Sequence, residues 1–320
     1  MSTSLWPILQ RKGGWSMAFD LEAFSAPLTF NWTLSYRCNF SCDHCYSRDE
    51  SCPELPTADI LRIVDILAEQ QVPFINFGGG EPLICNDLYE IASYASARGL
   101  NVSMNSNGWL LDRDAAWRLK EAGFKSVGIS LDSADSALHD DFRNMPGSWE
   151  RGVTALDALA EVGLKSTMSS VISRINYQNF RELLDLARDH QVRQVYLHNF
   201  KCSGRGFKNR QELDLDPEEW QAFYPEALAV KSQTADLTIS FDDPVIASLP
   251  GYQEQTLVKG SSCGKLSLHL RPNGDITPCG FIPLVVGNIL NDSFESIWFD
   301  SPVLKAMRAK EATGKCAGCS

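Results

Sequence analysis

Six short runs of apolar and β-branched residues alternate with helical patterns, and this alternation limits the possible fold more than any other feature of the sequence. The runs are Leu28–Tyr36, Val72–Phe77, Asn101–Ser106, Ser126–Leu131, Leu164–Val171 and Gln194–His198. Strands that alternate with helices form a parallel sheet with the helices outside. We therefore predict an α/β fold, a partial (β/α)6 TIM-like barrel, with its ligands at the carboxyl ends of the strands.

The helices are predicted from amphipathic spacing between these runs. They are expected at Thr57–Gln70, Asp87–Arg98, Asp112–Ala122, Trp149–Val162, Tyr177–His190 and Asp216–Ala235. After this last helix the pattern changes to a short strand at Leu237–Phe241 and then to short strands and turns. We therefore expect an N-terminal extension over residues 1–27, a core over 28–235 and a smaller domain over 236–320, within the usual size range of domains.

The smaller domain is expected to contain a β-hairpin. Its strands are Ser267–Leu270 and Ile276–Pro278, and Asn273-Gly274 supplies the turn between them. An Asn-Gly pair between two such runs is typical of a hairpin. Helical segments over Ser293–Lys310 follow the hairpin.

Ten cysteines give the first indication of chemistry. They are residues 38, 42, 45, 52, 85, 202, 263, 279, 316 and 319, and seven of them fall into two spaced groups. No secretory signal precedes them, so we expect reduced thiols in a cytoplasmic protein and not a disulfide framework. Grouped reduced cysteines favour ligation of a metal or a cluster.

The first group directly follows the first predicted strand. Cys38, Cys42 and Cys45 form a C-x3-C-x2-C motif. Three thiolates this close in sequence can hold three irons of a [4Fe-4S] cluster and leave the fourth iron open to an exogenous ligand. A zinc site completed by His44 is the alternative, since zinc takes four ligands of this kind.

This triplet resembles the signature of the radical S-adenosylmethionine (SAM) superfamily. Its third cysteine follows His44, the position that an aromatic or imidazole residue occupies in that pattern. The sequence Gly78-Gly79-Gly80-Glu81-Pro82, after the second strand, resembles the family's Gly-Gly-Glu motif. The resemblance places Gly79, Gly80 and Glu81 at the amino group of SAM, where glycine lets the backbone approach closely. By itself such a run is usually only a turn.

Further strand ends agree with this resemblance. It implies SAM contacts from Asn107, which precedes Gly108 after the third strand, and from Ser130 and Asp132, which end the fourth. The alternative for the fourth strand is that Asp132 or Ser133 caps a helix. Arg143 is the candidate partner of the SAM carboxylate, since a guanidinium pairs with a carboxylate through two hydrogen bonds, although a solvated surface arginine is the alternative. The resemblance also places His44 and Tyr46 at the cofactor.

The second cysteine group resembles the SPASM/twitch auxiliary-cluster domain. Fifteen residues separate Cys263 from Cys279, and Cys316 and Cys319 form a C-x2-C pair near the end of the sequence. Four thiolates saturate one auxiliary [4Fe-4S] cluster, whereas a structural zinc site with four cysteines is the alternative. Full SPASM domains have further cysteines after that pair. We expect either a twitch-like half domain or a truncated chain in which Cys316 and Cys319 belong to a second cluster.

Three cysteines remain outside both groups. Cys52, Cys85 and Cys202 are expected to be ordinary half-buried thiols, although Cys202 follows the sixth strand at the expected mouth of the barrel. Lys201 and Arg205, beside it, either meet an anionic group of a substrate or belong to a solvated loop.

Charge and hydropathy exclude two classes of partner. The formal net charge is −11, and nucleic-acid binding requires a basic surface, so we expect no nucleic-acid partner. No apolar run approaches the length that spans a bilayer, so we expect no membrane insertion. The resemblance instead implies a low-potential electron donor, a ferredoxin or a flavodoxin.

The resemblance also implies a reaction. One electron from the reduced cluster cleaves SAM to methionine and a 5′-deoxyadenosyl radical, which abstracts hydrogen from the substrate. We expect a peptide or protein substrate, as for a maturase, and the alternative is tetrapyrrole (haem-type) or other small-molecule cofactor biosynthesis. A non-catalytic electron carrier or scaffold and a nucleic-acid-modifying enzyme are disfavoured. The sequence identifies neither the substrate nor the bond formed.

Overall fold

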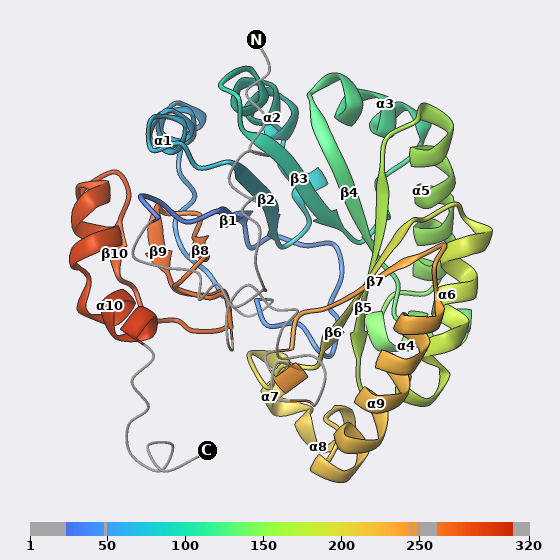
Figure 1. The fold of residues 1–320 in the computed structure, drawn as a ribbon. Coiled ribbons are helices and arrows are strands. Elements are labelled where there is room, and N and C mark those ends of the chain that lie inside the picture. Colours follow the sequence, from blue (N-terminus) through green and yellow to red (C-terminus); the bar gives the residue numbers. More distant parts are fainter. Residues whose placement is uncertain (1–23, 48–49, 244, 247–248, 250–260, 310–320) are drawn as a thin grey trace, which may run out of the picture.

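The computed structural model describes residues 24–47, 50–243, 245–246, 249 and 261–309. Within these residues one curved sheet has the strand order β10-β9-β8-β1-β2-β3-β4-β5-β6-β7 (Figure 1). The mutually parallel strands are β1 (Thr29–Ser35), β2 (Phe74–Gly79), β3 (Asn101–Ser106), β4 (Phe124–Ser130), β5 (Ser166–Ile172), β6 (Gln194–Asn199), β7 (Thr238–Phe241) and β8 (Ser267–Leu270). The antiparallel strands β9 (Asp275–Thr277) and β10 (Gly287–Asn288) complete the sheet. This arrangement confirms the predicted partial barrel.

Helices cover the outer side of the parallel strands (Figure 1). The longer ones are α1 (Thr57–Glu69), α2 (Leu88–Ala97), α3 (Arg113–Glu121), α5 (Ser148–Val162), α6 (Phe180–Asp189) and α9 (Pro217–Gln233). Shorter helical elements are η3 (Pro82–Ile84), α4 (Ser136–Arg143), η4 (Tyr177–Asn179), α7 (Arg205–Lys208), α8 (Arg210–Leu213), η6 (Ser296–Asp300) and α10 (Pro302–Ala309). The six predicted helices are therefore confirmed. Helices α4, α7 and α8 were not predicted.

The hydrophobic core lies between the sheet and these outer helices. Alternate residues of each strand point into it, among them Phe30, Trp32, Ile75, Phe77 and Met104, which are fully or almost fully buried. Burying one such side chain contributes about 1.5–3 kcal/mol relative to leaving it exposed. The apolar half of each strand therefore fixes the outer face of the barrel, and the other half is left for the inner face.

Both edges of the sheet are built from residues after position 235. On one edge β7 pairs in parallel with β6, so the predicted short strand extends the parallel sheet of the core. On the other edge β8 pairs in parallel with β1, and the predicted hairpin of β8 and β9 is confirmed. The C-terminal part of the chain is therefore continuous with the barrel sheet through its hydrogen bonds.

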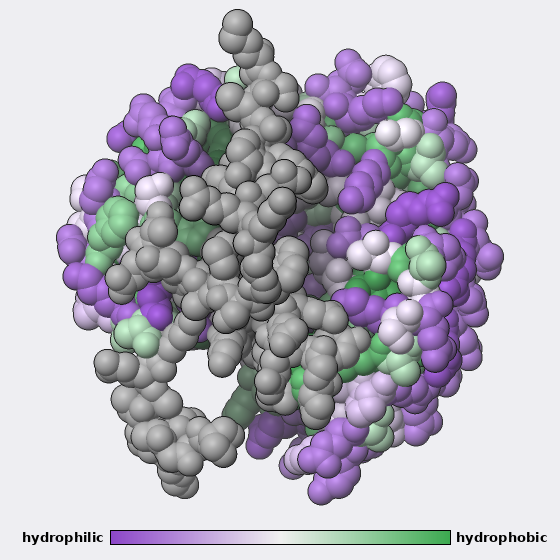
Figure 2. All heavy atoms as spheres, viewed as in Figure 1, coloured by the Kyte–Doolittle hydropathy of each residue, from purple (hydrophilic) through white to green (hydrophobic). Residues whose placement is uncertain are grey.

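The solvent-facing side of the helices is polar. Figure 2 shows hydrophilic side chains gathered over α3, α5 and α6, at the right of the view. Among the described residues, no helix combines the length and the apolar character that crossing a membrane requires. The apolar residues of these helices therefore serve the core.

Candidate active site

The inner face of the barrel is lined by small polar residues. Strand alternation and register bring Asn31, Asn76, Ser103, Asn105, Ser130, Thr167 and Ser169 to this face, opposite the buried apolar residues of the same strands. The Asn105 side chain belongs to a central strand and is nevertheless exposed. The interior thus differs from the packed apolar centre of a complete TIM barrel. Small polar side chains leave space for a polar ligand.

The cysteine loop begins directly after β1. Cys42 is buried, Cys38 and Cys45 are half-buried, and none of the three forms a disulfide. Burial raises the pKa of the Cys42 thiol to about 11. Among the described residues, no three His, Cys, Asp or Glu side chains converge as the ligands of one metal ion would. A [4Fe-4S] cluster does not require such convergence, because each thiolate binds a different iron.

The segment after β6 holds the cysteine loop in place. The Arg205 amide donates to the carbonyl of Cys45 at 3.0 Å, and its guanidinium donates to the carbonyl of Ser41 at 3.0 Å. Gly204 has a φ of +55°, and a Cβ on it would lie 2.4 Å from the carbonyl oxygen of Tyr46. Arg205, expected either to meet a substrate anion or to be solvated, therefore contacts the cysteine loop.

The glycine-rich turn after β2 packs against the start of the same loop. The Gly80 amide donates to the carbonyl of Ser35 at 2.9 Å, and the Glu81 amide donates to the carbonyl of Arg37 at 2.9 Å. A Cβ on Gly80 would lie 1.8 Å from the Arg37 carbonyl oxygen. A Cβ on Gly78 would meet no atom within 4 Å. The turn thus presents an open backbone on one side and a closely fitted one on the other.

Glu81 is a buried anchor and not an exposed ligand group. Its carboxylate accepts hydrogen bonds from the amides of Leu83 (3.1 Å) and Asn107 (2.8 Å) and from the hydroxyl of Ser106 (2.8 Å). Burial raises its pKa even though these donors oppose the shift. The Asn107 side chain donates to Asn39 at 2.8 Å and lies 3.9 Å from the Cys38 sulfur. Glu81 and Asn107 therefore tie the ends of β2 and β3 to the cysteine loop.

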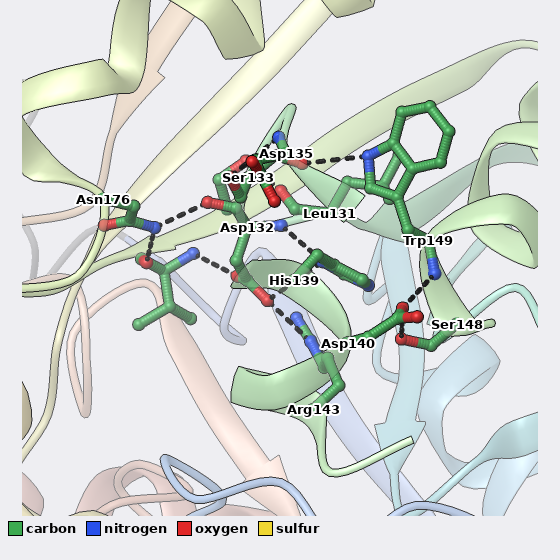
Figure 3. A network of polar contacts seen from close by, with 12 residues as sticks. Leu131, Asp132, Ser133, Asp135, His139, Asp140, Arg143, Ser148, Trp149 and Asn176 are labelled. Atoms are coloured by element: carbon green, nitrogen blue, oxygen red, sulfur yellow. Dashed lines mark hydrogen bonds and ion pairs between the residues drawn. The ribbon is translucent and has the colours of Figure 1, made fainter. Parts of the chain in front are cut away.

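Asp132 and Arg143 form a buried ion pair (Figure 3). The Arg143 Nε donates to Asp132 Oδ2 at 2.6 Å, and the amide of Val171 donates to Asp132 Oδ1 at 2.8 Å. Burial disfavours the Asp132 anion, but Arg143 holds the pKa of its carboxyl below the ordinary value. The cap of α4 is Asp135, which rules out the alternative that Asp132 or Ser133 caps this helix.

The structure places the remaining predicted SAM-site residues as follows. Ser130, at the end of β4, is half-buried on the inner face. The His44 ring stacks on Phe142 at 4.2 Å, its Nδ1 is buried with no hydrogen-bond partner, and burial lowers its pKa to about 3. The Tyr46 ring contacts Phe281 at 4.7 Å. Their contacts with SAM stay predictions.

The second cysteine group is described only in part. Cys263 and Cys279 lie together, and a hydrogen bond between their thiols holds the pKa of Cys263 below its ordinary value. Lys201, after β6, lies close enough to lower the pKa of both thiols. Cys316 and Cys319 lie outside the described residues. The pair from the hairpin therefore faces the carboxyl end of β6 across the barrel.

The other cysteines lie apart from both groups. Cys52 and Cys85 are half-buried, as expected. Cys202 is exposed, and its sulfur donates to the Asp214 carboxylate at 3.1 Å. The structure thus supplies each of the three with a structural environment outside the two candidate cluster sites.

Sequence reasoning missed several features of the site. It did not find α4, the role of Gly204 or the polar inner face. It also missed His198, at the end of β6, whose Nδ1 lies 3.1 Å from the Asp242 carboxylate. The signal for the inner face was present, since Asn31, Thr33, Ser103 and Ser169 interrupt the apolar runs at alternate positions.

Comparisons with known proteins agree with this site. A model described as the radical SAM superfamily matches residues 32–187, and one described as the SPASM iron-sulfur cluster-binding domain matches residues 262–320. The mycofactocin maturase MftC of Mycolicibacterium smegmatis is 30% identical over 307 residues, covering 93% of this chain and 76% of that protein. An AdoMet-dependent heme synthase of Methanosarcina barkeri is 27% identical over 310 residues, covering 92% and 89%.

Solved structures agree on the fold. SuiB of Streptococcus suis, in a crystal structure with its precursor peptide SuiA, matches with a TM-score of 0.75 at 18% identity over 91% of this chain and 69% of that chain. At this identity the likeness concerns the fold alone.

The partial barrel, its spaced thiols and its glycine-rich turn define an enzyme that binds an iron–sulfur cluster and a small cofactor at the strand ends. The chain belongs to the radical SAM superfamily and has a C-terminal SPASM domain. Membership implies a [4Fe-4S] cluster, SAM and auxiliary iron–sulfur binding. The residues fit these groups, because the three thiols need not converge and the backbone at Gly78 is open.

We expect Gly80→Ala to destabilise the protein, because its methyl group would collide with the rigid backbone at Arg37. Overpacking of this kind costs about 1–3 kcal/mol. The measurement is the anaerobic thermal midpoint of the reconstituted protein, with Gly78→Ala as the matched control because its methyl group enters open space. Equal midpoints for the two variants would contradict the close fit at Gly80.

Proposed function

We propose that this radical SAM enzyme modifies a peptide or a protein, with Cys38, Cys42 and Cys45 holding the SAM-binding cluster. The observation that carries the proposal is an exposed apolar segment after Cys279. Phe281, Ile282, Leu284 and Val285 are between 37% and 48% exposed. Exposed apolar groups of this kind mark interaction sites. Phe281 contacts Tyr46, the residue after Cys45, so the segment borders the cysteine loop.

The chemistry divides between the bound groups and the chain. When bound, the cluster and SAM supply a radical that can abstract hydrogen from an unactivated position. Cys263 and Cys279, with Cys316 and Cys319, are the proposed ligands of the auxiliary cluster. Ser130 and the open backbone at Gly78 offer polar groups to SAM at the strand ends. Arg205 and Glu81 keep the surrounding loops in place.

Relatives support this substrate class. The maturase MftC and the peptide-bound SuiB act on or bind peptides by their names and titles. The second candidate is a tetrapyrrole or another small molecule, which the heme synthase relative favours. Propionate groups of a tetrapyrrole need cations, and several near the cysteine loop have protein partners. Arg37 pairs with Glu54, and Arg271 pairs with Glu50. These contacts favour the peptide.

The test offers both substrate classes to the reconstituted enzyme. Short peptides encoded beside its gene, and separately an iron tetrapyrrole, are incubated anaerobically with SAM and a low-potential reductant, and the products are analysed by mass spectrometry. We expect a peptide to lose hydrogen or gain a crosslink, and Cys42→Ala to give no product. Conversion of the tetrapyrrole with every peptide unchanged would contradict the proposal.

The apolar segment provides a sharper variant. We expect Leu284→Asn to raise the KM for the peptide severalfold and to leave substrate-free SAM cleavage unchanged, since this residue borders the mouth without holding the cluster. Leu110→Asn is the matched control, because Leu110 is similarly exposed, at 44%, and lies outside the segment. An unchanged KM in Leu284→Asn would remove the segment from substrate binding.

A further inference from the structure

Asp132 and Arg143 are charged groups that the structure removes from water. The Asp132 side chain is 0% exposed and the Arg143 side chain is 10% exposed. Removing two charges from water costs several kcal/mol per ion, and their mutual attraction does not always repay it. Replacing such a pair with apolar residues is often neutral or stabilising. A buried pair at the edge of a reactive site therefore suggests a role beyond stability.

The helix that supplies Arg143 is docked on the cysteine loop on both sides of this residue. On one side, the carbonyl of Phe142 accepts from the Asp43 amide at 3.3 Å, and the Phe142 ring stacks on His44. On the other side, the Asn144 side chain donates to the Asp43 carboxylate at 2.6 Å and to the Ser41 carbonyl at 3.1 Å. The position of Arg143 relative to the loop is therefore fixed.

The guanidinium lies between a carboxylate and a sulfur. Its Nε donates to Asp132 at 2.6 Å, and it is close enough to Cys42 to form a hydrogen bond with that sulfur. Asp132 is itself fixed, because its Oδ1 accepts from the Val171 amide and its carbonyl accepts from Asn176 at 2.7 Å. Figure 3 shows Arg143 extending from α4 toward Asp132 inside this network. The pair thus aims a fixed positive charge at one sulfur ligand.

We propose that Arg143, oriented by Asp132, sets the reduction potential of the SAM-binding cluster through the sulfur of Cys42. Hydrogen bonds and charges at sulfur ligands tune such clusters. The reduced cluster has one more negative charge than the oxidised cluster, so a nearby cation stabilises the reduced state and raises the potential. Arg143 is a positioning residue in this account. The role applies whichever substrate the enzyme takes, because it concerns the cluster before substrate binds.

The role differs from contact with the carboxylate of SAM, which the sequence predicts for Arg143. A partner of that carboxylate would change the affinity for SAM and leave the SAM-free cluster unaltered. A partner of Cys42 would shift the potential of the cluster without SAM. Potentiometric titration of the reconstituted protein, followed by electron paramagnetic resonance in the absence of SAM, separates these two roles.

We expect opposite shifts from the two halves of the pair. Arg143→Gln lowers the midpoint potential, because a positive charge is lost beside the cluster. Asp132→Asn raises it, because a negative charge is lost and the cation stays. Arg143→Lys keeps the charge and shows a smaller shift than Arg143→Gln. Arg151→Gln is the control, since Arg151 is exposed on α5 and faces the Trp109 ring.

A merely structural role would not reverse the sign of the shift between the two halves of the pair. An unchanged SAM-free potential in Arg143→Gln, together with weakened SAM binding, would overturn the proposal in favour of the carboxylate contact. Where Arg143→Gln fails to retain iron, Arg143→Lys and Asp132→Asn decide. Shifts of the same sign in these two variants, or no shift in either, would equally overturn the proposal.

Discussion

The Cys42→Ala protein is expected to cleave no SAM. Cys42 is the buried member of the triplet, and its backbone lies in a loop held by Arg205 and by the last turn of α4. Without its sulfur the cluster would have two thiolates from this loop, so the iron–sulfur site would be lost or would lose its activity. The measurement is formation of 5′-deoxyadenosine from SAM and dithionite under anaerobic conditions.

The matched control is Cys85→Ala, because this thiol is half-buried on the same side of the sheet, beyond the glycine-rich turn. We expect it to retain SAM cleavage and the full iron content. Turnover in Cys42→Ala at the rate of the unaltered protein would remove Cys42 from the ligand set. It would also remove the basis for a potential set by Arg143.

The Cys279→Ala protein is expected to lose the auxiliary site and to keep substrate-free SAM cleavage. Cys279 lies beside Cys263, and Phe281, two residues later, contacts Tyr46 of the cysteine loop. Removing one of four proposed thiolates lowers the iron content by up to about four atoms, one cluster's worth. Conversion of the substrate is then lost, or falls by orders of magnitude, while formation of 5′-deoxyadenosine without substrate continues.

Cys202→Ala serves as the control for this experiment, since Cys202 is exposed and hydrogen-bonded to Asp214. We expect its iron content and its product formation to match those of the unaltered protein. Loss of SAM cleavage in Cys279→Ala, with the same iron content, would show that the assignment of this cysteine to a separate site is wrong.

Much of the barrel could be predicted because its signals are local. Each strand combines an apolar outer face with a short length, and each long helix repeats its apolar residues every three to four positions. The hairpin turn at Asn273-Gly274 is likewise determined locally, because Gly274 has a φ of +85°. The three close cysteines needed no tertiary information, since one loop contains them all.

The rest depends on contacts between distant segments. Helix α4 is short, and its interactions are with a loop about one hundred residues earlier, such as that of Asn144 with Ser41. Asp132 and Arg143 were predicted as contacts of SAM, but no periodicity shows that they pair with each other. The separation of a second domain at residue 236 also could not show that β7 and β8 extend the two edges of the barrel sheet.

The most direct test of the central claim is the content of iron, sulfide and zinc per chain after strictly anaerobic purification and reconstitution. The account predicts about eight irons with matching sulfide and no zinc, from one SAM-binding cluster and one auxiliary cluster of four irons each. Zinc in place of the auxiliary irons would contradict the auxiliary cluster and leave SAM chemistry intact. Zinc without iron at Cys38, Cys42 and Cys45 would contradict the proposed activity itself.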